Sequence, residues 1–276
     1  MSPARMPSSP TLAGSYGIRG ERLSGATAAA PACVVSLRPR GQHGALRRAA
    51  ARHGARVLAL SPLRIELRGD AATRAGLRTA LEAPLVVFTS PNAVHAARAL
   101  QPLRARRGQT WLAVGEGTAA ALRRAGIAHP VAPARMDSTG LLALPQLQVV
   151  DGIRIGLVTA PGGRDRIGPA LRARGAQILR AEVYARIAVA LRRDAVDRLC
   201  ALRTPPWLAL SSGEALDLLL AALPADALRH LRRARVVAAS PRLAALASRH
   251  GFDEVVVAAS AQPRDLLAAA ARAGSR

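Results

Sequence analysis

Short apolar runs alternate along most of the chain with longer segments whose apolar residues recur at helical spacing. The runs at residues 86–88 and 208–210 are each followed by hydroxyl residues and then by the start of a helical segment. Several helical segments end just before a glycine, such as Gly126 or Gly175, and glycine commonly ends a helix. Strands that alternate with amphipathic helices form parallel sheets flanked by helices. The pattern therefore predicts an α/β fold.

The same pattern occurs twice, because the chain contains an internal duplication. Residues 86–94 match residues 208–216, and residues 119–127 match residues 244–252, at offsets of about 122 and 125 positions. The two halves have the same order of strands and helices, so we expect two similar parallel-sheet α/β domains. A simple tandem would divide the chain near Val150.

Six loops that follow predicted strands carry small, glycine or hydroxyl-bearing residues. In open parallel sheets, ligands bind beyond the carboxyl ends of the strands, where helix N-termini offer free N–H groups to anions. A serine or threonine at such a position is also an ordinary helix N-cap, and capping alone explains any single one of them. The convergence of six loops is therefore the stronger evidence for an anion site. The candidate binding residues are Arg38, Thr89, Ser90, Gly115, Thr118, Gly162, Gly163, Ser211, Ser212, Ser240 and Arg242.

The net charge of +23 comes from 40 basic residues, all of them arginine, against 17 acidic ones. Such a charge favours anionic ligands or nucleic acid. Aromatic residues, on which many nucleic-acid-binding proteins stack bases, make up only 2% of the chain. Because helix–turn–helix, zinc-finger and RRM signatures are also missing, we expect no specific nucleic-acid partner. Part of the charge has a structural explanation, since arginines such as Arg123 and Arg172 lie where cations complement a helix dipole.

Apolar runs, the N-terminal segment and the cysteines indicate the cellular compartment in which we expect the protein. The longest apolar runs, such as residues 216–223, are far shorter than the ~20 residues of a membrane helix, so we expect a soluble protein without membrane contact. Residues 1–31 lack the apolar core of a signal peptide, and we expect a disordered leader or an over-long start with Met6 as the alternative initiator. Cys33 and Cys200 stand outside any CxxC pattern, which argues against a disulfide framework and favours a reducing cytoplasm.

Nucleotide and metal motifs are incomplete. The Gly115-Glu116-Gly117 segment lacks the third glycine of a dinucleotide fingerprint, and Gly162-Gly163 lacks a following Lys-Ser/Thr pair. His53 and His250 each precede a glycine, so a helix end explains them better than metal ligation. We therefore expect no nucleotide cofactor and no metal.

Tyr184 is the only tyrosine outside the leader, and its duplicate position is Leu63. Two interpretations stay open. The ring packs at a domain junction with its hydroxyl bonded to the backbone, or the hydroxyl has a chemical role. No Ser–His–Asp set or close carboxylate pair is apparent, so any catalysis would depend mainly on binding and orientation.

Five segments resemble the uroporphyrinogen-III synthase family, in order and at suitable spacing, between Cys33 and Leu267. They are residues 89–94 (TSPNAV), 113–119 (AVGEGTA), 137–142 (DSTGLL), 160–164 (APGGR) and 183–184 (VY). Together the five segments are fairly specific for the family.

The resemblance implies two α/β domains joined by a two-stranded linker that the chain crosses twice. Domain 1 would combine residues 32–60 with 188–274, domain 2 would be residues 66–182, and the linker strands would lie near residues 58–67 and 182–190. This arrangement replaces the tandem division. The duplication survives, because each domain takes its first strand–helix unit from the other half.

The resemblance also implies a reaction, the closure of the linear tetrapyrrole hydroxymethylbilane to uroporphyrinogen III with loss of water and inversion of the last pyrrole ring. No metal or organic cofactor is needed, and the polycarboxylate substrate suits helix N-termini and arginine. Tyr184 is then the expected proton donor to the departing hydroxyl. A transient contact with the upstream hydroxymethylbilane synthase is expected as well.

The sequence departs from the family pattern in places. The first strand of the family usually ends Thr-Arg-Pro, whereas Leu37 precedes Arg38 here. Ser240 and Arg242 fit the family's Ser-x-Arg form, but Leu243 stands where the duplicate of Thr118 would carry a hydroxyl. Two other functions remain open, a nucleic-acid-binding protein and a two-lobed binding protein for a small anion without turnover.

Overall fold

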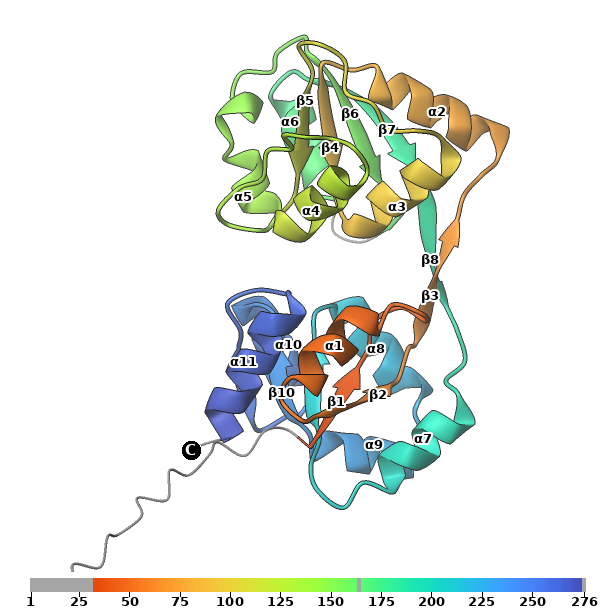
Figure 1. Cartoon of the computed structure of the whole chain (residues 1–276), viewed down its shortest axis with the longest axis vertical. Coiled ribbons are helices and arrows are strands. Elements are labelled where there is room, and N and C mark those ends of the chain that lie inside the picture. The colour runs from red at the N-terminus through yellow and green to blue at the C-terminus, as the bar shows by residue number, and fades with distance from the viewer. Residues whose placement is uncertain (1–31, 163–164, 275–276) are drawn as a thin grey trace, which may run out of the picture.

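The computed structural model describes residues 32–162 and 165–274, which form two lobes joined along one side (Figure 1). The expected leader at residues 1–31 and the candidate Gly163 lie outside the described residues. The chain passes from one lobe into the other and back, so its first and last described segments share a lobe.

Domain 1 contains a five-stranded parallel sheet with the strand order β11-β10-β9-β1-β2. Its strands are β1 (Cys33–Ser36), β2 (Arg56–Ala59), β9 (Trp207–Leu210), β10 (Arg235–Ala238) and β11 (Val255–Val257). One face is covered by α1 (Gly44–Ala51) and α11 (Pro263–Gly274). The other face is covered by α7 (Arg193–Cys200), α8 (Gly213–Ala222), α9 (Ala225–Arg232) and α10 (Pro241–Arg249). Side chains alternate between the faces of a strand, so Val34 packs on the α1 side and Val35 on the α8 side.

Domain 2 contains a four-stranded parallel sheet with the order β5-β4-β6-β7. Its strands are β4 (Leu85–Phe88), β5 (Thr110–Ala113), β6 (Arg154–Thr159) and β7 (Gln177–Glu182). One face is covered by α2 (Ala71–Leu81), α3 (Pro91–Leu100) and α4 (Glu116–Arg124), and the other by α5 (Ser138–Leu142), the short 3₁₀ helix η1 (Pro145–Leu147) and α6 (Ile167–Ala173). The rings of Phe88 and Trp111 stack on the first face with centroids 5.5 Å apart.

Two antiparallel strands, β3 (Leu63–Leu67) and β8 (Tyr184–Ala188), connect the domains. Leu67 lies opposite Tyr184, and Ile65 at the centre of β3 packs against the cores of both domains. These strands are shorter than the ranges expected for the linker, because Leu58 belongs to β2 and pairs with Val35 in the sheet of domain 1.

A tandem division near Val150 is wrong. It would separate β4 from β6, which are neighbours in one sheet, and β1 from β9, which are neighbours in the other. The division of the chain into residues 32–60 with 188–274 and residues 66–182 stays our proposal for the domain boundaries.

Glycines follow the helices where the sequence predicts helix ends. Gly126, after α4, has a φ of +99°, and Gly175, after α6, has a φ of +83°. His53 and His250 lie at the ends of α1 and α10, each just before a glycine with positive φ. In the part of the chain that the structure describes, no three His, Cys, Asp or Glu side chains are grouped to hold a metal ion. Within the two described stretches, no helix is both long and apolar enough to cross a membrane.

Candidate active site

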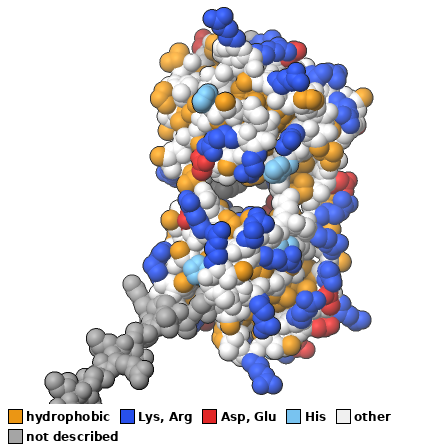
Figure 2. Space-filling view, in the orientation of Figure 1, with side chains coloured by type: hydrophobic (Ala, Val, Ile, Leu, Met, Phe, Trp, Pro, Cys, Tyr) orange, Lys and Arg blue, Asp and Glu red, His pale blue; other side chains and the backbone are white. Residues whose placement is uncertain are grey.

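A cavity of about 750 Å³ lies between the two domains. Figure 2 shows a hollow between the lobes, with basic side chains near its edges. Five of the described candidate binding residues line this interdomain cavity, and they are Arg38, Gly115, Thr118, Ser211 and Ser240. They come from the ends of β1, β5, β9 and β10 and from the first turn of α4. The carboxyl ends of the strands in both sheets therefore face the same space.

Helix N-termini line this cavity from both domains. The first residues of α3, α4 and α10, which are Pro91, Glu116 and Pro241, all line it. The Oγ atom of Ser240 accepts a hydrogen bond from the Leu243 N–H and so caps the start of α10. The positive ends of the three helix dipoles favour a bound carboxylate.

Arg38 contributes the charge on the domain 1 side. It follows β1, and its Nη2 atom donates to the Ala261 carbonyl at 3.2 Å. Burial lowers the pKa of the Arg38 guanidinium. Because an arginine side chain stays protonated in proteins, Arg38 is a partly desolvated cation, which attracts a carboxylate more strongly than an exposed one does.

His43 anchors the loop that carries Arg38. The ring is 4% exposed, with Nδ1 2.9 Å from Ser36 Oγ and Nε2 2.8 Å from Ser61 Oγ. Since the Ser61 hydroxyl donates to the Arg38 carbonyl, it must accept from Nε2–H, and Nδ1 then accepts from Ser36. Burial, together with the charges of Arg47 and Arg38, lowers the pKa of His43 to about 4. His43 is therefore neutral at pH 7 and holds the loop by hydrogen bonds.

A smaller cavity of about 200 Å³ lies within domain 2. Ser90 lines it while the next residue, Pro91, lines the interdomain cavity, so both cavities reach the N-terminus of α3. Three more candidates, Thr89, Gly162 and Tyr184, also line it, together with Thr159.

Tyr184 is 4% exposed, and its ring belongs to the core of domain 2. Its hydroxyl lies 3.0 Å from Ser90 Oγ, which also accepts from the Ala93 N–H as the N-cap of α3. The partner of the hydroxyl is thus a side chain and not the backbone, which corrects the first interpretation of this residue. The Tyr184 ring is therefore buried in the core, while its hydroxyl makes a polar contact at the wall of the smaller cavity.

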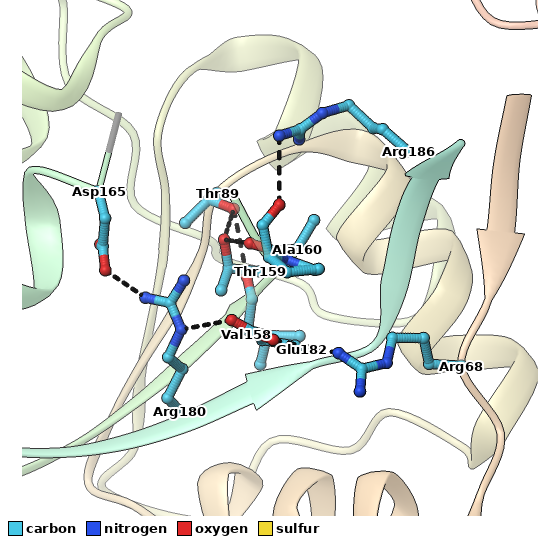
Figure 3. Close-up of polar contacts among 10 residues, drawn as sticks. Arg68, Thr89, Val158, Thr159, Ala160, Asp165, Arg180, Glu182 and Arg186 are labelled. Carbon is cyan, nitrogen blue, oxygen red and sulfur yellow. Dashed lines mark hydrogen bonds and ion pairs between the residues drawn. The ribbon is translucent and has the colours of Figure 1, made fainter. Parts of the chain in front are cut away.

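Among the described residues, three arginines line the smaller cavity, which are Arg166, Arg180 and Arg186. Figure 3 shows that Arg180 donates to Asp165 and Glu182, at 2.7 and 2.9 Å, so two carboxylates neutralise its charge. The Thr89 hydroxyl donates to Thr159 Oγ1 at 2.9 Å nearby. This wall therefore combines arginine side chains with hydroxyl groups, and both are donors that can bind a carboxylate.

The chain matches a sequence model of one family over residues 44–268, and the description of that family is "Uroporphyrinogen-III synthase HemD". The chain belongs to the uroporphyrinogen-III synthase family. A uroporphyrinogen-III synthase of Salmonella typhimurium is 35% identical over 206 residues, which are 70% of this chain and 80% of that protein. A uroporphyrinogen-III synthase of Escherichia coli is 34% identical over 161 residues, which are 58% of this chain and 65% of that protein.

Solved structures of the same family have the same fold. A mutant uroporphyrinogen III synthase from Thermus thermophilus has a TM-score of 0.59 at 20% identity, over 87% of this chain and 98% of that chain. A uroporphyrinogen-III synthetase from Helicobacter pylori has a TM-score of 0.55 at 13% identity, over 85% of this chain and 96% of that chain. The expected α/β fold class and the resemblance to the uroporphyrinogen-III synthase family are confirmed.

Two described candidates line neither cavity. Ser212 instead caps α8, where its Oγ atom accepts from the Ala215 N–H, and Arg242 lies in the first turn of α10. The sequence did not mark as candidates the three described arginines of the smaller cavity or the segments 134–137 and 258–263 at the interdomain cavity. A signal existed for Arg186, because it lies two residues after Tyr184 and so shares its face of the strand. The missed segments carry no common motif that would have marked them.

Proposed function

We propose that the protein closes hydroxymethylbilane to uroporphyrinogen III, with loss of water and inversion of ring D. The observation that carries this proposal, beside membership of the family, is the cavity of about 750 Å³ into which helix N-termini of both domains point. A linear tetrapyrrole with eight carboxylates needs anion-binding groups on several sides, and a two-domain cavity supplies them. The names of the relatives favour this enzyme over a binding protein without turnover.

The chemistry requires little from the protein beyond a proton and a shape. The bond between the hydroxymethyl carbon and its oxygen breaks with help from the pyrrole nitrogen, and the oxygen leaves as water once it is protonated. The carbon then bonds to the substituted carbon of ring D, and the bond from that ring carbon to the methylene group of ring C breaks. This methylene carbon bonds to the free carbon of ring D, which inverts the ring, and the proton that the free carbon loses balances the one donated. Held in an unguided conformation, the substrate would close at the free carbon and give the symmetric isomer. Orientation is thus the main catalytic contribution.

Tyr184 is our candidate for the proton donor, and Arg38, Thr89, Ser90, Gly115, Thr118, Gly162, Ser211 and Ser240 are our candidates for substrate contacts. Ser90 has a particular role, because its contact of 3.0 Å fixes the Tyr184 hydroxyl at the wall of the smaller cavity. The reaction as written uses no metal or organic cofactor. We also propose a cytoplasmic location and a transient contact with the upstream synthase, because hydroxymethylbilane closes spontaneously once it is released.

The test supplies hydroxymethylbilane, freshly made by its upstream synthase, and separates the uroporphyrin isomers after oxidation. We expect isomer III in proportion to added protein, and only isomer I from well-folded protein would refute the proposal. Tyr184→Phe should slow closure to isomer III by about a hundredfold or more, the usual contribution of a general acid. It should leave the melting curve nearly unchanged, since it removes a single hydrogen bond. Unchanged turnover in this variant would remove Tyr184 from the role.

A further inference from the structure

Arg186 connects the two domains at the middle of the linker. It lies opposite Ile65 at the centre of the β3–β8 pair. Its Nη2 atom donates to the Pro161 carbonyl of domain 2 at 3.3 Å (Figure 3). Its Nε atom lies 2.6 Å from Oε2 of Glu214, in the first turn of α8 in domain 1. One guanidinium therefore contacts a loop of one domain and a helix of the other.

The charge of Glu214 depends less on this ion pair than the charge of Arg186 does. The Glu214 side chain is 45% exposed, and the dipole of α8 stabilises a carboxylate in its first turn without any arginine. The Arg186 side chain is only 22% exposed, and it lines the smaller cavity beside Arg166 and Arg180. Its Nε atom is buried and approaches Glu214 without the angle of a hydrogen bond. Arg186 therefore remains available for a better-oriented carboxylate.

The smaller cavity has the size and position for such a carboxylate. Its volume of about 200 Å³ equals that of about six or seven water molecules, which admits an acetate or propionate arm but not a tetrapyrrole. Tyr184 and Arg186 lie on one face of β8, about 7 Å apart along the strand. An arm bound to Arg186 would bring the pyrrole ring that carries it towards the Tyr184 hydroxyl.

We propose that a substrate carboxylate replaces Glu214 on Arg186, so that the ion pair fixes the domains in the free enzyme and substrate binding releases this restraint. Arg186 is then a specificity-determining residue for a carboxylate arm next to the reacting carbon. Glu214 is an internal competitor for the same guanidinium. The identity of the ligand in this inference rests on the proposed function. The restraint on the domains does not.

Binding is tested with Glu214→Gln, Arg186→Gln and the double variant. Glu254→Gln serves as the matched control, because Glu254 pairs with Arg235 on domain 1 and lines neither cavity. The probes are hydroxymethylbilane, for KM and kcat, and uroporphyrin III, which carries the same eight carboxylates and is not turned over. Glu214→Gln should lower KM and the Kd for uroporphyrin III about two- to fivefold, the factor of a partly exposed ion pair. Arg186→Gln should raise both about tenfold or more, change KM more than kcat, and abolish the effect of Glu214→Gln.

The restraint is tested by the distance between spin labels at Arg78 and Arg249, which are exposed on α2 and α10, after Cys33 and Cys200 are replaced by alanine. Glu214→Gln and Arg186→Gln should each broaden the distance distribution of the free protein, and Glu254→Gln should not. Uroporphyrin III should broaden the wild-type distribution or shift its mean. The proposal is overturned if Glu214→Gln binds uroporphyrin III no more tightly than the wild type, or if its distance distribution is unchanged. A wild type that yields only isomer I would refute the proposed function, while these two readouts would still decide the role of Arg186.

Discussion

Tyr184 and Leu63 occupy equivalent positions, because each is the first residue of a linker strand and each is buried in the core of a different domain. Leu63 is 2% exposed in the core of domain 1, and Tyr184 is 4% exposed in the core of domain 2. Both residues anchor a strand as it leaves a domain. Tyr184 differs from Leu63 in having a hydroxyl group, which lies at a cavity wall. Leu63 therefore shows the packing role of this position alone, and the hydroxyl of Tyr184 is available for a second role at the site.

The duplicated serines Ser90 and Ser212 offer a controlled comparison. Both cap a helix, α3 and α8, but only Ser90 Oγ contacts the Tyr184 hydroxyl. Ser90→Ala and Ser212→Ala should each lower the free energy of unfolding by about 1 kcal/mol, the usual cost of a lost N-cap. Ser90→Ala alone should also lower kcat for isomer III, by about fivefold, because the Tyr184 hydroxyl loses its partner. Equal kcat values in the two variants would show that Ser90 has no effect on catalysis beyond its role as a helix cap.

His43 should make the stability of domain 1 depend on pH. Its pKa is about 4 in the folded state, against an ordinary value of 6.5, because burial and the neighbouring Arg47 and Arg38 disfavour the charged ring. Between pH 6.5 and 4 the unfolded chain binds a proton that the folded chain does not, so stability falls as the pH falls through this window. The contribution lost is roughly 3 kcal/mol.

The measurement is urea unfolding of the wild type and of His43→Gln at pH 7.5 and pH 4.5. The wild type should lose more stability between these pH values than the variant, which lacks the titrating ring. Parallel losses in the two proteins would show that the buried imidazole is not the origin of the pH dependence.

Local features of this fold could be predicted from the sequence because they depend on a few neighbouring residues. The caps at Ser90, Ser212 and Ser240 and the helix ends before Gly126 and Gly175 are of this kind. The duplication indicates two similar domains but not which strands share a sheet, since β1 pairs with β2 and also with β9 from the other half of the chain. The linker crossing was therefore available only through resemblance to a family.

The role of Arg186 could not be predicted from the sequence because it also depends on long-range contacts. Arg186 meets Glu214 across the two domains, and their contact depends on how the domains are arranged. Apart from the position of Arg186 two residues after Tyr184, no local pattern in a chain with 40 arginines distinguishes an arginine that lines a cavity from one that lies on a solvated surface.

Gly156 on β6 packs directly against α2. A Cβ atom at this position would lie 1.9 Å from the Ala80 carbonyl oxygen, which is backbone and cannot move without shifting the helix. Gly156→Ala should therefore destabilise the protein by about 2–4 kcal/mol, measured by urea or thermal unfolding. Gly76→Ala, within α2, is the control, because its Cβ would lie 3.9 Å from the nearest atom, and it should stabilise by up to about 1 kcal/mol. A Gly156→Ala variant as stable as the wild type would contradict the close contact of α2 and β6.

Arg38 should bind a substrate carboxylate from the domain 1 side of the interdomain cavity. Its guanidinium is partly desolvated, and its loop is held independently by the hydrogen bond from the Ser61 hydroxyl to the Arg38 carbonyl. Arg38→Gln should therefore raise KM about tenfold or more without unfolding the loop. Arg38→Lys should have an intermediate KM, because an ammonium group keeps the charge but cannot form the two parallel hydrogen bonds of a guanidinium. Arg40→Gln removes the same charge from an exposed residue of the same loop that lines neither cavity, and it should change KM less than twofold. If Arg38→Gln and Arg40→Gln raised KM equally, the attraction would come from the general positive charge of the surface and not from a site at Arg38.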